Sequence, residues 1–201
     1  MVDELDEESA EIRDLYAEAG VALYLAQVLE HGIVNILVLA DMLSLKEKAR
    51  TEGVKPTKEK IAEYVAMAED AEERHYKRTM GNLLEKLYEL KIEFPDGLEA
   101  LLNQGLEARN RIAHRFFRER ALEIANHEGR LVAIAELKEM QDVFNKADAP
   151  LDKIFRQIAI KLGLPIEHFA EYERMYTEAA RAGGITEKEL QNQLGNLCTG
   201  G

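Results

Sequence analysis

Residues 15–45 form the most apolar stretch of the chain, and this stretch constrains the fold more than any other feature. A membrane span needs about 20 nearly uninterrupted apolar residues. Here polar or charged residues recur at short intervals: Glu18, Gln27, Glu30, His31, Asn35 and Asp41. The pattern predicts a long helix that is buried around most of its circumference, rather than a span. Such a helix is the centre of a bundle or the seam of a dimer.

Turn and cap signals divide the next part of the chain into helices. Thr57 is expected to cap a helix that runs to about residue 72, and another helix is expected over 76–91. A proline–glycine turn follows, with Asp96 placed as the cap of the next helix. That helix is expected to continue to Ala125.

The C-terminal part of the chain gives similar signals. A helix over 130–146 precedes the run Asp-Ala-Pro at 148–150, which predicts a new helix that ends near Gly163. Pro165 is expected to start a further helix, and Thr186 a short terminal one. No stretch alternates with a period of two for long enough to predict a strand. The predicted fold is therefore all-α, an antiparallel bundle of seven or eight helices.

The balance of charge limits the partners that this chain can have. It contains 38 acidic and 26 basic residues and has a formal net charge of -12, which argues against broad, non-specific binding of nucleic acid or of anionic membranes. Residues 109–120 are the exception, with five arginines and one acid. These arginines form either a local anion site or ion pairs with acids of other helices.

Cysteine usage and the N-terminus indicate a cytoplasmic protein without a prosthetic group. Cys198 is the single cysteine, so neither an intramolecular disulfide nor a cysteine-based metal cluster can form. The chain begins with acidic residues where a secretory signal carries basic ones. No glycine-rich phosphate loop and no metal-ligand pattern is recognisable, and we expect neither a cofactor nor a metal.

The arginine-rich segment contains the run Arg109-Asn110-Arg111-Ile112-Ala113-His114. On a helix, Asn110 and His114 lie four residues apart on one face, close enough for a side-chain contact. Arg109 lies about 140° away around the helix, so it must reach round or act from a second chain. A neighbouring apolar stripe is expected to pack inward and hold the helix: Ala113, Phe117, Ala121 and Ile124.

This combination resembles the HEPN superfamily (higher eukaryotes and prokaryotes nucleotide-binding). Active members are helical bundles that carry an arginine, then a polar residue, and a histidine after four to six intervening positions. Arg109, Asn110 and His114 match that pattern, and we refer to these three residues as the motif. The resemblance covers residues 9–125, and residues 130–201 are expected to be additional helices packed on this bundle.

The resemblance implies metal-independent RNA cleavage by a homodimer in which two motifs face each other. His114 would act as the general base on the ribose 2′-hydroxyl or as the acid that protonates the leaving 5′-oxygen. Arg109 would stabilise the charge on the phosphoryl oxygens, and Asn110 would position His114 or the phosphate. The remaining arginines would bind RNA: Arg111, Arg115 and Arg118. A toxin or phage-defence role would add an antitoxin or a nucleotidyltransferase as partner.

The alternative is a non-catalytic helical protein that dimerises or binds a partner such as a nucleotidyltransferase. It predicts that Arg109 pairs with an acid of a neighbouring helix. Arg120 and His127 also fit the range of the family pattern, with six intervening residues, but Ala121 follows the arginine, so this pair is a decoy.

Two further histidines stand beside acids. His75 follows Glu72 at the spacing of a di-iron ligand pair, but its charged surroundings favour a solvated helix face. Glu30 and His31 form either a functional pair or a satisfied histidine in the core or an interface.

Overall fold

The computed structural model describes residues 6–54, 57–90 and 92–164, together with Ile166, Arg174, Thr177 and Glu178. The chain divides into two units, residues 1–158 and 159–201, and all the sites discussed below lie in the first. The helices predicted to start at Pro165 and Thr186, and Cys198, fall outside the described residues.

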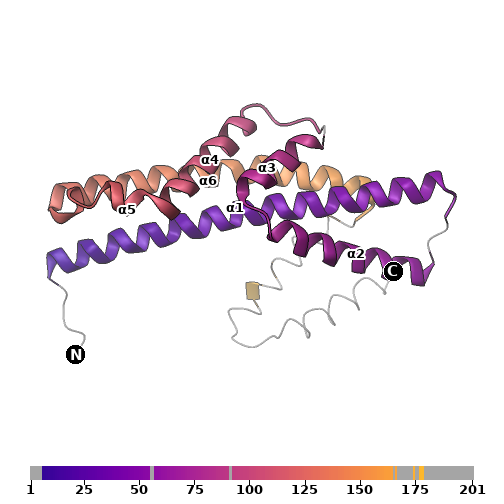
Figure 1. The fold of residues 1–201 in the computed structure, drawn as a ribbon, viewed down its shortest axis with the longest axis horizontal. Helices are drawn as coiled ribbons and strands as arrows, with labels where there is room; N and C mark the ends of the chain where they lie inside the picture. The colour runs from indigo at the N-terminus through magenta and orange to yellow at the C-terminus, as the bar shows by residue number, and fades with distance from the viewer. Residues whose placement is uncertain are drawn as a thin grey trace. The chain divides into compact units, whose positions relative to one another are not determined.

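The described part of the chain is all-helical, as predicted (Figure 1). It contains six α-helices and one short 3₁₀ helix: α1 Glu7–Thr51, α2 Lys58–Tyr76, α3 Met80–Glu89, α4 Leu98–His114, α5 Phe116–Glu119, η1 Glu123–Ala125 and α6 His127–Leu162. Thr57 caps α2 as predicted, because its Oγ1 accepts from the backbone N–H of Lys60 at 3.2 Å.

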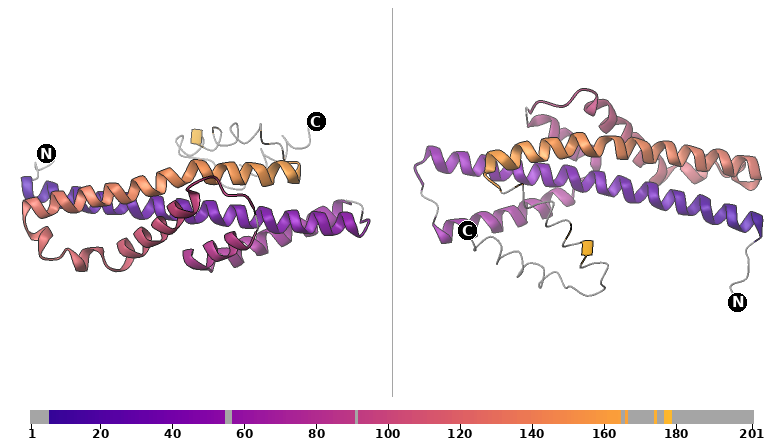
Figure 2. Two further views of the ribbon diagram at one scale, coloured as in Figure 1. Left: turned by 90° about the horizontal axis from the view of Figure 1, so that it is seen from above. Right: turned by 180° about the vertical axis from the view of Figure 1, so that it is seen from behind.

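α1 is the central helix of the first unit, which confirms the predicted bundle centre. α2, α3 and α4 all pack against it. α6 lies beside it and runs in the same direction (Figures 1 and 2), with Arg130 opposite Glu11 and Gln141 opposite Glu18. α4 runs the other way, since Gly105 lies against Leu29 and Phe117, three residues after the end of α4, stacks on Tyr16.

The parallel helices α1 and α6 share a seven-residue packing repeat. Their buried residues are spaced alternately by four and three positions, as in coiled coils. They are Leu15, Ala19, Ala22, Ala26, Leu29 and Ile33 on α1, and Ala133, Leu137, Met140, Phe144, Ala147, Leu151, Ile154 and Ile158 on α6. The opposite face of the N-terminal half of α1 is open: Tyr16 and Tyr24 are 59% and 64% exposed. The prediction that α1 is buried around most of its circumference is therefore wrong for this half.

α6 is continuous through Pro150, so the predicted break at 148–150 is wrong. An internal proline removes one backbone hydrogen bond and costs a helix about 3 kcal/mol. Burial of the apolar repeat on both sides of it, from Phe144 and Ala147 to Leu151 and Ile154, offsets that cost.

The helix that was predicted to continue to Ala125 ends earlier in the structure. α4 ends at His114, and the chain turns at Arg115 before the single turn of α5. Its N-cap is Gly97, whose φ of 78° suits glycine, and not Asp96. With the split of this helix and the continuity of α6, the predicted count of seven or eight helices is not reproduced in the described residues.

The buried stripe of α4 and α5 also differs from the predicted one. Gly105, Ala108, Ile112 and Phe116 face the core. At Gly105 the helices approach closely, because a Cβ atom would lie 3.1 Å from Leu29 Cδ2. Of the residues predicted to pack inward, Ala113 and Ala121 are exposed, whereas Phe117 and Ile124 are half-buried.

α1 is long and apolar enough to cross a membrane by length and composition alone, and core helices of soluble proteins meet the same criterion.

Candidate functional site

Arg109 is tied to the bundle by two contacts. Its Nε donates to Glu30 Oε1 on α1 at 2.9 Å, and its Nη1 donates to Asn110 Oδ1 at 3.3 Å. The side chains of Arg109 and Glu30 are 30% and 24% exposed, so the ion pair is partly shielded from water. This is the pairing that the non-catalytic alternative predicts.

His114 is the last residue of α4 and is exposed. Within the described chain its imidazole has neither a hydrogen-bond nor an ion-pair partner. Asn110 lies one turn earlier on the same helix face, away from the core. The structure therefore brings Arg109 and Asn110 together and leaves His114 free beside them.

Acidic side chains neutralise much of the arginine-rich segment. Arg111 pairs with Glu119 at 3.0 Å and also with Glu136. Arg120 pairs with Glu136 at 2.7 Å and also with Glu123. The interpretation that these arginines pair with acids therefore holds for both of them, as it does for Arg109.

The two other arginines near the motif are more open. Arg115 has Glu119 at 3.9 Å, and Arg118 is exposed without an ion-pair partner among the described residues. Both keep most of their guanidinium donors available for a ligand.

Arginine contacts also lower the pKa of two glutamates. A hydrogen bond from Arg111 lowers the pKa of Glu119, with the charges of nearby arginines adding to it. A hydrogen bond from Arg130, which is buried, lowers the pKa of Glu11, and His127 acts in the same sense. These ion pairs join the start of α6 to α1 and α5 to α4.

We expect the protein to lose stability as the pH falls below about 4.5, the ordinary pKa of a glutamate. A carboxylate whose pKa is lower in the folded state stabilises the fold above its unfolded pKa. That contribution is lost as the pH falls through the folded pKa. Urea unfolding midpoints measured between pH 7 and pH 3 test this. Glu11→Gln should be less stable at pH 7 and should depend less on pH in the acid range; parallel profiles would contradict the assignment.

The remaining histidines occupy three different environments. His75 is only 7% exposed, and its Nε2 lies 3.1 Å from Asp41 Oδ2, so the prediction of a solvated helix face is wrong for this residue. The residues next to His75 in the sequence are charged, but His75 itself faces α1 and is buried there. Nδ1 of His31 contacts the hydroxyl of Tyr76, and the decoy His127 pairs with Glu11.

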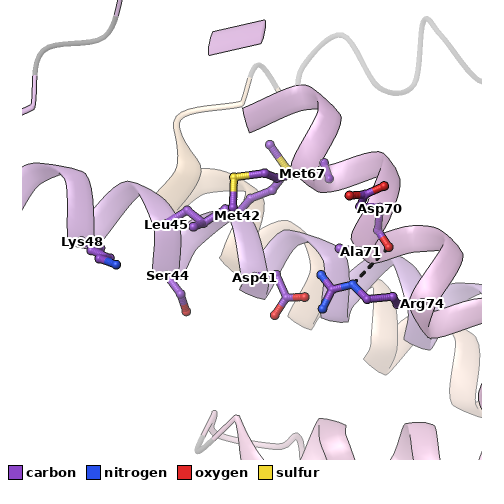
Figure 3. Close-up of a pocket in the computed structure, with 10 residues that line it drawn as sticks. Asp41, Met42, Ser44, Leu45, Lys48, Met67, Asp70, Ala71 and Arg74 are labelled. Atoms are coloured by element: carbon purple, nitrogen blue, oxygen red, sulfur yellow. Dashed lines mark hydrogen bonds between the residues drawn. The ribbon is translucent and has the colours of Figure 1, made fainter. Parts of the chain in front are cut away.

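A cavity of about 380 Å³ lies between α1 and α2 (Figure 3). Met42 and Met67 meet at one side of it, and the guanidinium of Arg74 points toward Asp41. Arg74 Nε donates to the backbone carbonyl of Asp70 at 3.2 Å. Two acids and two bases line this cavity, so it has no preference for one sign of charge.

A second cavity of about 420 Å³ lies between α1 and the turn that joins α2 to α3. Glu30, the partner of Arg109, is in its wall. Neither of these two cavities includes a residue of the motif.

In the part of the chain that the structure describes, no three His, Cys, Asp or Glu side chains converge as metal ligands. No protein-family model, no curated protein and no solved structure matches this chain.

Proposed function

We propose that this chain is a metal-independent endoribonuclease of the HEPN type that acts as a homodimer in the cytoplasm. The observation that carries the proposal is the imidazole of His114, which is exposed and has no partner among the described residues, with Asn110 on the same helix face and Arg109 hydrogen-bonded to Asn110. An imidazole that can exchange a proton and a guanidinium that binds phosphate are two groups that RNA cleavage needs.

The ion pair with Glu30 leaves Arg109 able to bind a phosphate. A guanidinium carries five N–H donors. Glu30 accepts from Nε and Asn110 accepts from Nη1, while Nη2 has no partner among the described residues. Glu30 therefore orients the guanidinium and does not exhaust it.

In this proposal His114 takes the proton from the ribose 2′-hydroxyl or donates one to the leaving 5′-oxygen. The 2′-oxygen attacks the adjacent phosphorus, and the bond to the 5′-oxygen breaks. Arg109 stabilises the charge on the non-bridging oxygens. Arg115 and Arg118 are the arginines best placed to bind flanking phosphates, because Arg111 is engaged by Glu119 and Glu136.

The outward face of α1 supports self-association. Tyr24 and Gly20 are both exposed and lie one turn apart, and a Cβ on Gly20 would meet nothing within 4 Å. In an antiparallel two-fold pairing centred on residue 22, Tyr24 of each copy would lie opposite Gly20 of the other. Tyr16 stacks on Phe117 at 5.3 Å, and Phe117 is three residues from His114. A second copy on this face would therefore lie near the motif.

Tyr24→Glu is expected to weaken self-association at least tenfold, because it puts a charge in the centre of the paired apolar face. Sedimentation velocity across a range of protein concentrations measures this. Val65→Glu, at a similarly exposed apolar position on α2, should leave the association unchanged. If the wild type is a monomer and sediments with phosphatidylcholine vesicles, the exposed face of α1 binds a membrane instead.

The nuclease proposal is tested with total cellular RNA in EDTA. We expect cleavage that leaves a 2′,3′-cyclic phosphate or a 3′-phosphate and a 5′-hydroxyl. A DNA oligonucleotide of matching sequence should stay intact, because it lacks the 2′-hydroxyl nucleophile. Intact RNA at every protein concentration would contradict the proposal.

The second candidate is a non-catalytic helical protein that dimerises or binds a partner, such as a nucleotidyltransferase. The ion pair between Arg109 and Glu30 favours it, since it provides a structural role for the arginine of the motif. Intact RNA together with a dimer that Tyr24→Glu disrupts would support this function.

A further inference from the structure

The cavity between α1 and the α2–α3 turn combines a hydrophobic floor with polar walls. Its volume of about 420 Å³ falls in the range of small-molecule sites, about 300–1,000 Å³. Val28, which is 39% exposed, contributes apolar surface to the cavity, and Val34 and Leu83 are almost fully buried beneath it. A ligand with a hydrophobic part can therefore remove this surface from water.

Two rings form one wall of the cavity. The rings of His31 and Tyr76 have centroids 5.6 Å apart and planes tilted by 30°, and both residues are exposed. Burial, with the charge of Glu72 adding to it, raises the pKa of Tyr76, and the Tyr76 hydroxyl contacts Nδ1 of His31. The two rings offer a flat aromatic surface with polar atoms at its edge.

The charged side chains that line the cavity are Glu30 and Arg78. Glu30 is paired with Arg109, which is not part of the lining. Arg78, in the turn between α2 and α3, is exposed and has no ion-pair partner among the described residues. Its guanidinium can form two parallel hydrogen bonds with a carboxylate or a phosphate.

We propose that this cavity binds a small anion that carries a planar ring. The anionic group is held by Arg78, and the ring lies against Tyr76 and His31 above Val34 and Leu83. This site is separate from the motif and does not depend on the proposed RNA cleavage.

Isothermal titration of the full chain with phenyl phosphate, benzoate and benzyl alcohol tests the proposal. We expect at least one of the two anions to bind and the neutral alcohol to bind at least tenfold more weakly. The stronger anion identifies phosphate or carboxylate as the preferred group.

Two substitutions locate the binding. Arg78→Gln should weaken the anion at least tenfold. Arg50→Gln, which removes another exposed arginine far from the cavity, should leave the affinity unchanged. Tyr76→Leu keeps an apolar side chain but removes the ring, and it should also weaken binding. The proposal is overturned if neither anion binds the wild type, if the alcohol binds equally well, or if the two arginine variants behave alike.

Discussion

His114→Ala is expected to lower the rate of EDTA-resistant RNA cleavage by about 100- to 10,000-fold, the usual contribution of a general acid or base. The imidazole is exposed at the end of α4 and has no partner in the described chain, so its removal leaves no buried group unsatisfied. The free energy of unfolding should therefore stay within about 0.5 kcal/mol of the wild type. A loss of activity without a loss of stability separates a catalytic histidine from a structural one.

His127→Ala is the matched control, because His127 is also an exposed histidine that follows an arginine, here with six intervening residues instead of four. The side chain of His127 pairs with Glu11, a residue of α1. We expect this variant to cleave RNA at the wild-type rate. Equal activity of wild type and His114→Ala would exclude the proposed mechanism, and equal loss in both histidine variants would indicate a general effect of the substitution.

Period and cap signals in the sequence predicted most helices of the described chain, and the failures have physical causes. Asp148 and Pro150 resemble a helix start, but the seven-residue apolar repeat from Ala133 to Ile158 continues through them. Tertiary burial outweighs the local proline signal. The same repeat is visible in the sequence, so counting it would have predicted one long α6.

The orientation of α4 was the larger error for the site. Two apolar stripes overlap in this segment, and Ala113 with Phe117 resembled the buried one. Gly105 lies on the buried stripe with Ala108, Ile112 and Phe116, and its missing side chain lets α4 approach Leu29 closely. A glycine within a helix can pack against several different partners, so the sequence alone does not predict that Gly105 packs against Leu29.

The sequence predicts that an acid could pair with the arginine of the motif, but it does not predict which acid. An acid that pairs with Arg109 was an open alternative, but its identity depends on how α1 and α4 align along their lengths. Glu30 and Arg109 are 79 positions apart in the chain, and the intervening helices set that alignment. His75 shows the same limit, since Asp41 reaches it from α1.

Phe116→Ala is expected to lower the free energy of unfolding by about 3–5 kcal/mol, the usual cost of removing a buried phenylalanine. The side chain is 0% exposed at the start of α5. Its ring packs edge-on against Phe117 at 5.4 Å, and the guanidinium of Arg111 lies over it at 5.9 Å. The cavity left by the substitution would lie at the junction of α4 and α5, two residues from His114.

The neighbouring substitution Phe117→Ala provides the comparison. Phe117 is half-buried and stacks on Tyr16, so its loss should cost about 1–2 kcal/mol. Urea unfolding of both variants measures the difference. If the sequence-based orientation of α4 were right, Phe117→Ala would be the more damaging of the two. A larger loss for Phe116→Ala establishes the orientation that directs Asn110 and His114 away from the core, on which the proposed site depends.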